Sequence, residues 1–164
     1  MNVDASIFKA YDIRGIYPTE LNEEIAEKIG RAFARLIKSE NPGKKIKIAL
    51  SRDMRLSSPG LSGRLTEGLL KSGVNVTNIG LTSTPAFYFG TAYYGFDAGI
   101  QVSASHNPPE FNGFKMVRAR GVPVSEDSGI KQIRDWVRED KWTDEEPACG
   151  VNQIFKLLPF VPIG

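Results

Sequence analysis

The segment IKIALSRDMR, residues 46–55, decides the fold class of this chain. Its first half alternates Ile46, Ile48 and Leu50 with other side chains, which predicts a β-strand. The polar residues 51–55 follow at the carboxyl end of that strand, where open α/β sheets usually place their ligand loops. Ser58 with Pro59 then predicts the first turn of a helix. A strand, a polar loop and a helix in this order indicate an α/β fold.

The chain upstream of this segment predicts one more strand and one more helix. Residues 7–11 are expected to form the first strand, and residues 12–15 the loop that leaves it. Asn22 is expected to cap a helix that stops before Pro42. The apolar face of this helix consists of Ile25, Ile29, Phe33, Leu36 and Ile37. The pairs Glu24–Lys28 and Glu27–Arg31 have i,i+4 spacing and are expected on its solvated face.

Downstream, strands and helices continue to alternate. The helix from Ser58 is expected to end at Gly73, a strand to cover residues 74–79, and Thr84 to cap a short helix over residues 85–93. Residues 97–102 and 114–117 are expected to be strands, and Ser125 or Ser128 to cap a last helix. The residues of the two later helices that are expected in the core are Phe87, Tyr88, Phe89, Tyr93, Ile130, Ile133, Trp136 and Val137.

This order of elements predicts a single α/β domain with three layers, α/β/α, and a mostly parallel sheet. Residues 1–140 are assigned to that domain. Residues 141–150 are polar and read as a linker, and residues 154–162 are apolar but fit neither the helical nor the strand period. We therefore interpret residues 141–164 as a linker followed by an atypical tail.

Composition excludes several classes of protein. The chain has 164 residues and a net charge of +2 from 21 basic and 19 acidic residues, which is too balanced for a general nucleic-acid binder. Its single cysteine, Cys149, excludes an internal disulfide and a multi-cysteine zinc site. No apolar run approaches the ~20 residues of a membrane span, and no leader pattern precedes Ile7. The chain is expected to be cytoplasmic, with no membrane or nucleic-acid partner.

The candidate site lies in the loop between the two last strands, SASHNPPEFNG, residues 103–113. Its two prolines are expected to hold the loop extended, and Asn112 with Gly113 predicts a tight turn. The loop presents the hydroxyl of Ser105 and the only imidazole of the chain, His106, and Lys115 follows it.

Three interpretations of this loop remain open on spacing alone. It could be a plain connection, the site of a serine hydrolase, or a phosphate site in which Ser105 carries a phosphoryl group. The hydrolase interpretation is weakened because Ser105 and His106, as neighbours on an extended chain, project to opposite sides. Arg52 and Arg55 could either contact phosphate or support the loop.

Four ordered motifs resemble those of one enzyme family. Ser105-His106-Asn107-Pro108 with residues 112–115 (NGFK) resembles the phosphoserine loop of the α-D-phosphohexomutases. Residues 8–15 (FKAYDIRG), 52–58 (RDMRLSS) and 82–85 (TSTP) match further motifs of that family in the right order. The resemblance covers the N-terminal, phosphoserine-bearing domain, and residues 8–15 are more similar to the phosphomannomutase/phosphoglucomutase branch than to the glucosamine branch.

The resemblance implies a mixed sheet with one antiparallel strand and a phosphoryl transfer between the 1- and 6-positions of a hexose phosphate. Phosphorylated Ser105 would be the donor and would also contribute to binding Mg²⁺, with a hexose 1,6-bisphosphate as activator. Arg14 and Lys115 would hold or neutralise the moving group, and Lys115 could also exchange protons. Tyr11, His106 and Asn107 would contact the substrate.

Other segments of the family do not occur in these 164 residues. The Asp-x-Asp-x-Asp-Arg motif of its metal loop is absent from the sequence, and so are its sugar-recognition and distal phosphate loops. The resemblance therefore implies that the remaining mutase domains are partners, that the sugar cannot be read here, and that the chain alone is inactive. Two alternatives stay open: a non-catalytic phosphate-binding or interaction module left from a truncated mutase, and a phosphoglucosamine mutase fragment.

Overall fold

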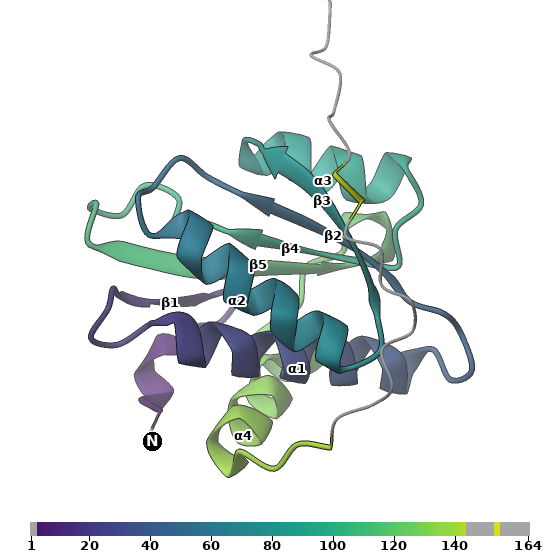
Figure 1. Ribbon diagram of the computed structural model, residues 1–164, viewed down its shortest axis with the longest axis horizontal. Helices are drawn as coiled ribbons and strands as arrows, with labels where there is room; N and C mark the ends of the chain where they lie inside the picture. Colours follow the sequence, from purple (N-terminus) through teal and green to yellow (C-terminus); the bar gives the residue numbers. More distant parts are fainter. Residues whose placement is uncertain (1–2, 144–152, 155–164) are drawn as a thin grey trace, which may run out of the picture.

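A mixed β-sheet forms the centre of the computed structural model, which describes residues 3–143 and 153–154. The strands follow the order β1-β5-β4-β2-β3-β6 across the sheet (Figure 1). Their bounds are β1 Ile13–Ile16, β2 Lys47–Arg52, β3 Asn75–Leu81, β4 Ala98–Val102, β5 Phe111–Arg118 and β6 Gln153–Ile154. β5 is antiparallel to both of its neighbours, and the pairs β2–β4, β2–β3 and β3–β6 are parallel. The expectation of a mixed sheet with one antiparallel strand is confirmed.

Helices cover both faces of the sheet, so the predicted three-layer α/β/α architecture is also confirmed (Figure 1). The larger core lies under α1 (Glu23–Glu40), α2 (Ser58–Lys71) and α4 (Lys131–Glu139). The smaller core lies under α3 (Thr84–Tyr93), on the other face. Within residues 3–143, no helix is both long enough and apolar enough to cross a membrane.

The alternation in residues 46–50 gives β2 its place in the middle of the sheet. Ile48 and Leu50 enter the core under α1 and α2, while Ala49 enters the core under α3. Successive side chains of a strand point to opposite faces, so the apolar run of residues 48–50 suits a sheet that is covered on both sides. Ala49 shares this smaller core with Phe87 of α3.

The prediction of a first strand over residues 7–11 is wrong. A short 3-10 helix, Ala5–Ile7, follows Asp4, and the chain then reverses, with the amide of Lys9 donating to the carbonyl of Asp12 at 2.8 Å. Phe8 forms only an isolated bridge with Ile13, where β1 begins. The apolar residues Ile7 and Phe8 pack against the core from this turn, so their burial does not require a strand. Arg14 consequently lies inside β1 and not in a loop.

Two helix caps are displaced by one residue from the prediction. Ser57 precedes α2, and Ser83 precedes α3 and accepts from the amide of Ala86. The displacement leaves Ser58 and Thr84 free to donate to Asp53 and Gln101, as described below. The last helix agrees in part: Ser125 and Ser128 form a reciprocal capping box, but it starts a π-helical turn, Glu126–Ile130, that leads into α4, and the N-cap of α4 itself is Ile130. The predicted linker and tail lie outside the described residues, apart from residues 141–143 and β6.

The aromatic residues of α3 also differ from the prediction. Phe87 is fully buried and Tyr88 is partly buried, but Phe89 and Tyr93 are exposed and stack on each other with their ring centroids 5.1 Å apart. Among the described residues, α3 is the only α-helix on its face of the sheet, so only one side of it can reach β-strands. Four aromatic residues within ten positions cannot all share that side.

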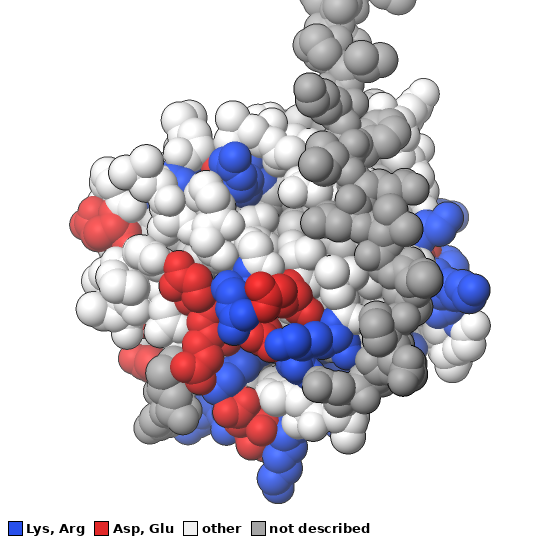
Figure 2. Space-filling model, in the orientation of Figure 1, with Lys and Arg blue, Asp and Glu red and all other residues white. Residues whose placement is uncertain are grey.

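The charged side chains of α1 are predicted from the sequence to form a solvated face. In the structure they lie between α1 and α2 and are partly buried. Figure 2 shows acidic and basic side chains gathered over these helices. The predicted pairs exist, but the side chains of Lys28 and Arg31 are each only 10% exposed. Glu27 also accepts from Arg64 at 2.5 Å and from Lys71 at 2.7 Å, both from α2. The ion pairs therefore join the two helices.

We expect Glu27→Gln to lower the free energy of unfolding at pH 7 by about 1–3 kcal/mol, the usual cost when a part-buried polar group loses a charged partner. Burial would raise the pKa of Glu27, but its bonds to Lys71, Arg64 and Arg31 outweigh burial and lower the pKa below its usual 4.5. The stabilisation is thus present above pH 4.5 and is lost as the pH falls through the lowered pKa.

Urea denaturation of both proteins from pH 7 to pH 3 tests this expectation, because the difference between them should shrink below pH 4.5. Glu67→Gln is the matched control, since Glu67 binds only Arg64 among the described residues and is 47% exposed. An exposed pair of that kind contributes about 0–1 kcal/mol. A difference that stays constant over the pH range would contradict the network.

The two helices also touch backbone to backbone at two glycines. A Cβ added to Gly68 of α2 would lie 2.0 Å from the carbonyl oxygen of Glu27, and one added to Gly30 of α1 would lie 2.4 Å from the carbonyl oxygen of Leu65. Glycine is therefore required at both positions by the close approach of the helices, and not by a turn.

Candidate functional site at the carboxyl ends of the parallel strands

A cleft of about 690 Å³ opens where β2, β3 and β4 end. Its lining comes from the segments that leave these three strands, including Asp53, Thr82, Ser103, Ser105 and His106. The carboxyl ends of parallel strands meet at one edge of the sheet, where open α/β folds bind their ligands. Residues 51–55 and the serine loop therefore lie at one site, as the sequence predicted.

Ser105 occupies the left-handed region of backbone conformation, with φ at 55°. The loop is not extended as predicted, because residues 105 and 106 form a turn. Hydrogen bonds within the loop stabilise this turn. The backbone amide of Ser105 donates to Ser103 Oγ at 3.1 Å, and both the backbone nitrogen and the side-chain Nδ2 of Asn107 donate to the carbonyl of Ala104. A non-glycine residue seldom adopts this conformation, and residues so strained cluster at functional sites.

Asn112 and Gly113 do not form the predicted tight turn. Both lie inside β5, and neither has a positive φ. Asn112 donates from its side chain to the hydroxyls of Ser57 at 2.8 Å and Ser58 at 3.0 Å, which ties β5 to the start of α2. A Cβ at Gly113 would lie 2.2 Å from the carbonyl oxygen of Ile13, so glycine is needed here for the close approach of β1.

Arg55 holds the serine loop by its backbone. One guanidinium nitrogen, Nη1, donates to the carbonyl oxygens of Pro108 at 2.7 Å and Phe111 at 3.1 Å. The other, Nη2, donates to those of Ser105 at 3.1 Å and Asn107 at 2.7 Å. Of the two alternatives left open by the sequence, contact with phosphate or support of the loop, these contacts favour support.

Asp53 anchors Arg55 to the scaffold. Its carboxylate accepts from Arg55 Nε at 3.2 Å, from the amide of Arg55 at 3.1 Å and from Ser58 Oγ at 2.6 Å. The amide of Asp53 donates to the carbonyl of Val102 at the end of β4. The loop, the end of β4 and the first turn of α2 are thus connected through one residue, Asp53.

Arg14 and Lys115, the predicted catalytic cations, meet at Asp12. Arg14 Nη2 lies 2.6 Å and Lys115 Nζ 3.5 Å from Asp12 Oδ2, and Asp12 is only 6% exposed. Burial raises the pKa of Tyr88, and the negative charge of Asp12 raises it further. Arg14 Nε is buried and has no hydrogen-bond partner in the described structure. One carboxylate therefore holds two cations.

The register of the sheet places these cations at the base of the serine loop. Arg14 is opposite Gly113, and the carbonyl of Gly113 accepts from the amide of Ser103 at 2.9 Å. Lys115 is opposite Gln101 of β4. Since Ser103 and Gln101 line the cleft, Arg14 and Lys115 lie one or two strands away from it.

The remaining predicted residues differ in position. His106 is exposed and lines the cleft. The side chain of Asn107 is occupied inside the loop, and Tyr11 is 70% exposed in the turn before β1. Their assignment to substrate binding stays a prediction.

Sequence reasoning did not single out Asp12 or Gln101. Gln101 is buried at the floor of the cleft, where it donates to Thr82 and accepts from Thr84 Oγ1 at 2.9 Å. A signal was available, because Gln101 is the only polar residue in a strand that otherwise reads Ala-Gly-Ile-Val. Asp12 is the residue before the first apolar position of β1, and only the fold reveals that two cations face it.

The described residues do not supply a metal site by themselves. Residues 3–143 and 153–154 bring together no group of three or more aspartate, glutamate, histidine or cysteine side chains. Mg²⁺ prefers several oxygen ligands in octahedral geometry, so a phosphate on Ser105 would offer only part of such a site.

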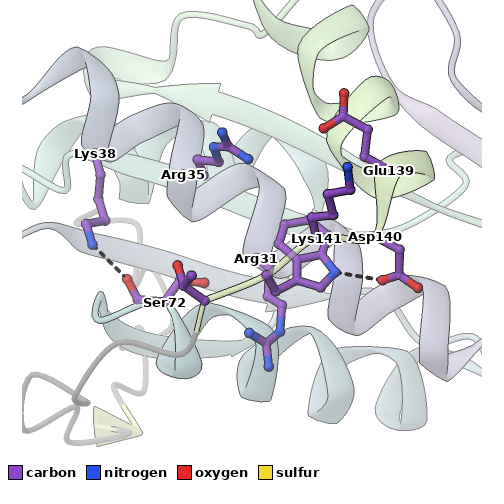
Figure 3. Close-up of a pocket in the computed structure, with 9 residues that line it drawn as sticks. Arg31, Arg35, Lys38, Ser72, Glu139, Asp140 and Lys141 are labelled. Atoms are coloured by element: carbon purple, nitrogen blue, oxygen red, sulfur yellow. Dashed lines mark hydrogen bonds between the residues drawn. The ribbon is translucent and has the colours of Figure 1, made fainter.

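A second pocket, of about 750 Å³, lies between the ends of α1, α2 and α4 (Figure 3). It is basic, with Arg31, Arg35 and Lys38 along α1, but these cations have partners: Lys38 donates to the carbonyl of Ser72, and Arg35 lies over the ring of Trp136. Asp140 in its wall accepts from Trp142 Nε1 at 2.7 Å. This pocket is at the opposite end of the helices from the serine loop.

The class defined by this fold and site is an α/β/α domain that presents a strained serine and two cations at the carboxyl edge of its sheet. The chain belongs to the phosphoglucomutase/phosphomannomutase family, because residues 5–144 match the model of that family's α/β/α domain I. The expected family resemblance is thereby confirmed.

Individual relatives agree with this assignment. The chain is 43% identical to a phosphomannomutase of Vibrio cholerae over 95% of its own length and 33% of that protein. It is 45% identical to a phosphomannomutase of Klebsiella pneumoniae over 86% of each chain. The crystal structure of a phosphoglucomutase/phosphomannomutase family protein from Burkholderia thailandensis superimposes with a TM-score of 0.79 at 34% identity, over 94% of this chain and 33% of that one. The chain thus spans about a third of the Vibrio and Burkholderia proteins.

Proposed function

We propose that this domain carries the phosphoserine of a mutase that moves a phosphoryl group between the 1- and 6-positions of a hexose phosphate. The observation that carries the proposal is Ser105 itself, a non-glycine residue held at φ 55° at the mouth of a cleft. In the first step the bond between Ser105 Oγ and phosphorus breaks as a sugar hydroxyl takes the phosphoryl group. The bisphosphate then reorients and returns its other phosphoryl group to Ser105 Oγ.

Arg14 and Lys115 supply the positive charge that this transfer needs. Phosphoryl transfer depends on positioning and on neutralising the oxygens of the moving group. Asp12 orients both cations, and its single charge leaves the trio with a net charge of +1 for an incoming phosphate. The Arg14 side chain is 32% exposed, so part of its guanidinium can contact the phosphate, and Lys115 exchanges the proton of the sugar hydroxyl.

The other components of the reaction are proposed to come from outside the described residues. Mg²⁺ would be held by the phosphate on Ser105 together with carboxylates of the remaining mutase domains, and it would neutralise phosphate charge there. A hexose 1,6-bisphosphate would prime Ser105 as activator. His106 contacts the sugar phosphate from the loop, with Tyr11 and Asn107 as further candidates. We propose a mannose or glucose phosphate as substrate, in the cytoplasm, and no turnover by the 164-residue chain alone.

Ser105→Ala is expected to abolish covalent phosphorylation of a protein that carries this domain together with the rest of the mutase. Intact-mass analysis after incubation with glucose or mannose 1,6-bisphosphate measures the added phosphate. Ser125→Ala is the control, because Ser125 is a helix cap outside the cleft and its variant should be labelled as the wild type is.

Retention of label in the Ser105→Ala protein would move the nucleophile elsewhere, with Ser103 as the nearest hydroxyl in the loop. Binding of the bisphosphate without any covalent label in the wild type would favour the other class, a non-catalytic phosphate-binding module. Faster turnover of glucosamine phosphate than of mannose or glucose phosphate would assign the domain to a phosphoglucosamine mutase.

A further inference from the structure

We propose that Arg55 is a positioning residue for the transfer: its guanidinium fixes the backbone of Ser105 in the left-handed conformation and so aims the serine Oγ. The inference rests on the proposed function, since it concerns the geometry of the same serine. It assigns Arg55 no contact with the substrate.

The first reason is that the strained conformation of Ser105 needs a support that the loop backbone offers only in part. A residue stays in a sparsely populated backbone region only when its surroundings hold it there. Pro108 and Pro109 have no amide hydrogen, so they cannot donate to the loop carbonyls. The carbonyl oxygens of Ser105, Asn107, Pro108 and Phe111 instead all accept from the one guanidinium of Arg55.

The second reason is that Arg55 has no donor left for a substrate. A guanidinium has five N–H donors in a rigid plane. Four of them meet the loop carbonyls and the fifth, on Nε, meets Asp53 Oδ2 at 3.2 Å. The side chain is 13% exposed. A phosphate could engage Arg55 only by displacing bonds that hold the loop, so the structure favours positioning over direct contact.

The third reason is that Arg55 is itself fixed to rigid elements. Asp53, its carboxylate partner, is bonded to Ser58 in the first turn of α2 and to Val102 at the end of β4. Catalytic groups act best when their own supports are locked to helices and strands. Arg55 therefore transfers the position of β4 and α2 to the backbone of Ser105.

Arg55→Lys and Arg55→Met test this proposal in a protein that carries the domain with the rest of the mutase. Lysine keeps the charge but offers only three donors on one nitrogen, which cannot reach four carbonyl oxygens in a plane. We expect both variants to lower kcat roughly 100-fold, the usual effect of misplacing a reacting group by about 1 Å. KM should change little, because Arg55 does not touch the substrate.

Arg118→Lys is the matched control for a purely structural role. Arg118 also joins a carboxylate to a loop carbonyl, binding Glu40 at 2.7 and 2.8 Å and the carbonyl of Ser128, but it lies at the far end of β5. We expect Arg118→Lys to lower the melting temperature and to leave kcat unchanged. Two results would overturn the proposal. One is that the Arg118 and Arg55 variants lose the same stability and show the same fall in kcat. The other is that Arg55→Lys keeps the wild-type kcat.

A second measurement separates this inference from the proposed function. In the 164-residue chain labelled with ¹³C-serine, the Cα and Cβ chemical shifts of Ser105 report its backbone conformation without any catalysis. Arg55→Lys should move these shifts toward values for extended or averaged backbone, while those of Ser103 stay closer to the wild type. Unchanged Ser105 shifts would refute the positioning role even if turnover is normal, whereas a wild-type protein without phosphoryl transfer would refute only the proposed function.

Discussion

Gly68→Ala is expected to destabilise the domain by about 3 kcal/mol, at the upper end of the range for overpacking a tight interior contact. The added methyl group would lie 2.0 Å from the carbonyl oxygen of Glu27, a distance at which α1 and α2 must separate. Backbone atoms cannot turn aside as a side chain could. Separation would also stretch the bonds from Glu27 to Arg64 and Lys71. Urea-induced unfolding followed by circular dichroism measures the change.

Gly63→Ala is the control for this substitution in the same helix. A Cβ at Gly63 would meet no atom within 4 Å. Replacing a helical glycine by alanine should then raise the free energy of unfolding by about 0.5–1 kcal/mol. The two variants are therefore expected to change the free energy of unfolding in opposite directions, although both replace a glycine of α2 by alanine. Equal effects of both substitutions would mean that the helices do not approach each other as closely as the structure has them.

Lys115→Ala and Arg14→Ala are each expected to lower kcat by on the order of 100-fold or more in the complete mutase. The physical reason is the loss of one preorganised donor aimed at the charge of the moving phosphoryl group. Both cations are held at Asp12 before any substrate binds, at 2.6 and 3.5 Å, so the wild type spends little energy on orienting them. Initial rates of 6-phosphate formation from mannose 1-phosphate or glucose 1-phosphate measure the effect.

Lys131→Ala and Arg134→Ala are suitable controls, because both cations lie on α4 and pair with exposed carboxylates of α4 or of the turn before it. They should have wild-type rates. If Lys115→Ala and Arg14→Ala also have wild-type rates, these two residues take no part in the phosphoryl transfer. A fall in Lys115→Ala alone would restrict the catalytic assignment to Lys115.

Much of the fold follows from local pattern. The apolar residues of the segment 46–50 and of the predicted face of α1 lie in the core as predicted. They could be identified because apolar residues recur every two positions in a half-buried strand and every 3.6 positions on one face of a helix. The errors arise where a long-range contact outweighs a local preference. Asn112-Gly113 has the composition of a turn, but β1 approaches so closely that glycine is required inside a strand. Ile7 and Phe8 are apolar like a strand, but the chain reverses at residues 9–12.

The site shows the same division. The order of motifs sufficed to select Ser105, Arg14 and Lys115 as a group, and the register of β1, β5 and β4 brings their segments to one edge of the sheet. Asp12 could not be selected in that way, because its importance depends on two cations facing it from β1 and β5. The contacts of Arg55 join residues 50 to 56 positions apart, and no local signal records such pairs.

The guanidinium of Arg55 recognises only main-chain oxygens, which every amino acid possesses. Apart from the bonds that the Ser103 and Asn107 side chains make inside the loop, the geometry of the serine loop therefore does not depend on which side chains it carries. His106 and Glu110, both exposed in this loop, can be exchanged without removing any bond to Arg55. Such an arrangement separates the part of the loop that must stay constant from the part that can vary. It would let evolution, or a protein engineer, change the exposed side chains of the loop while Ser105 keeps its position.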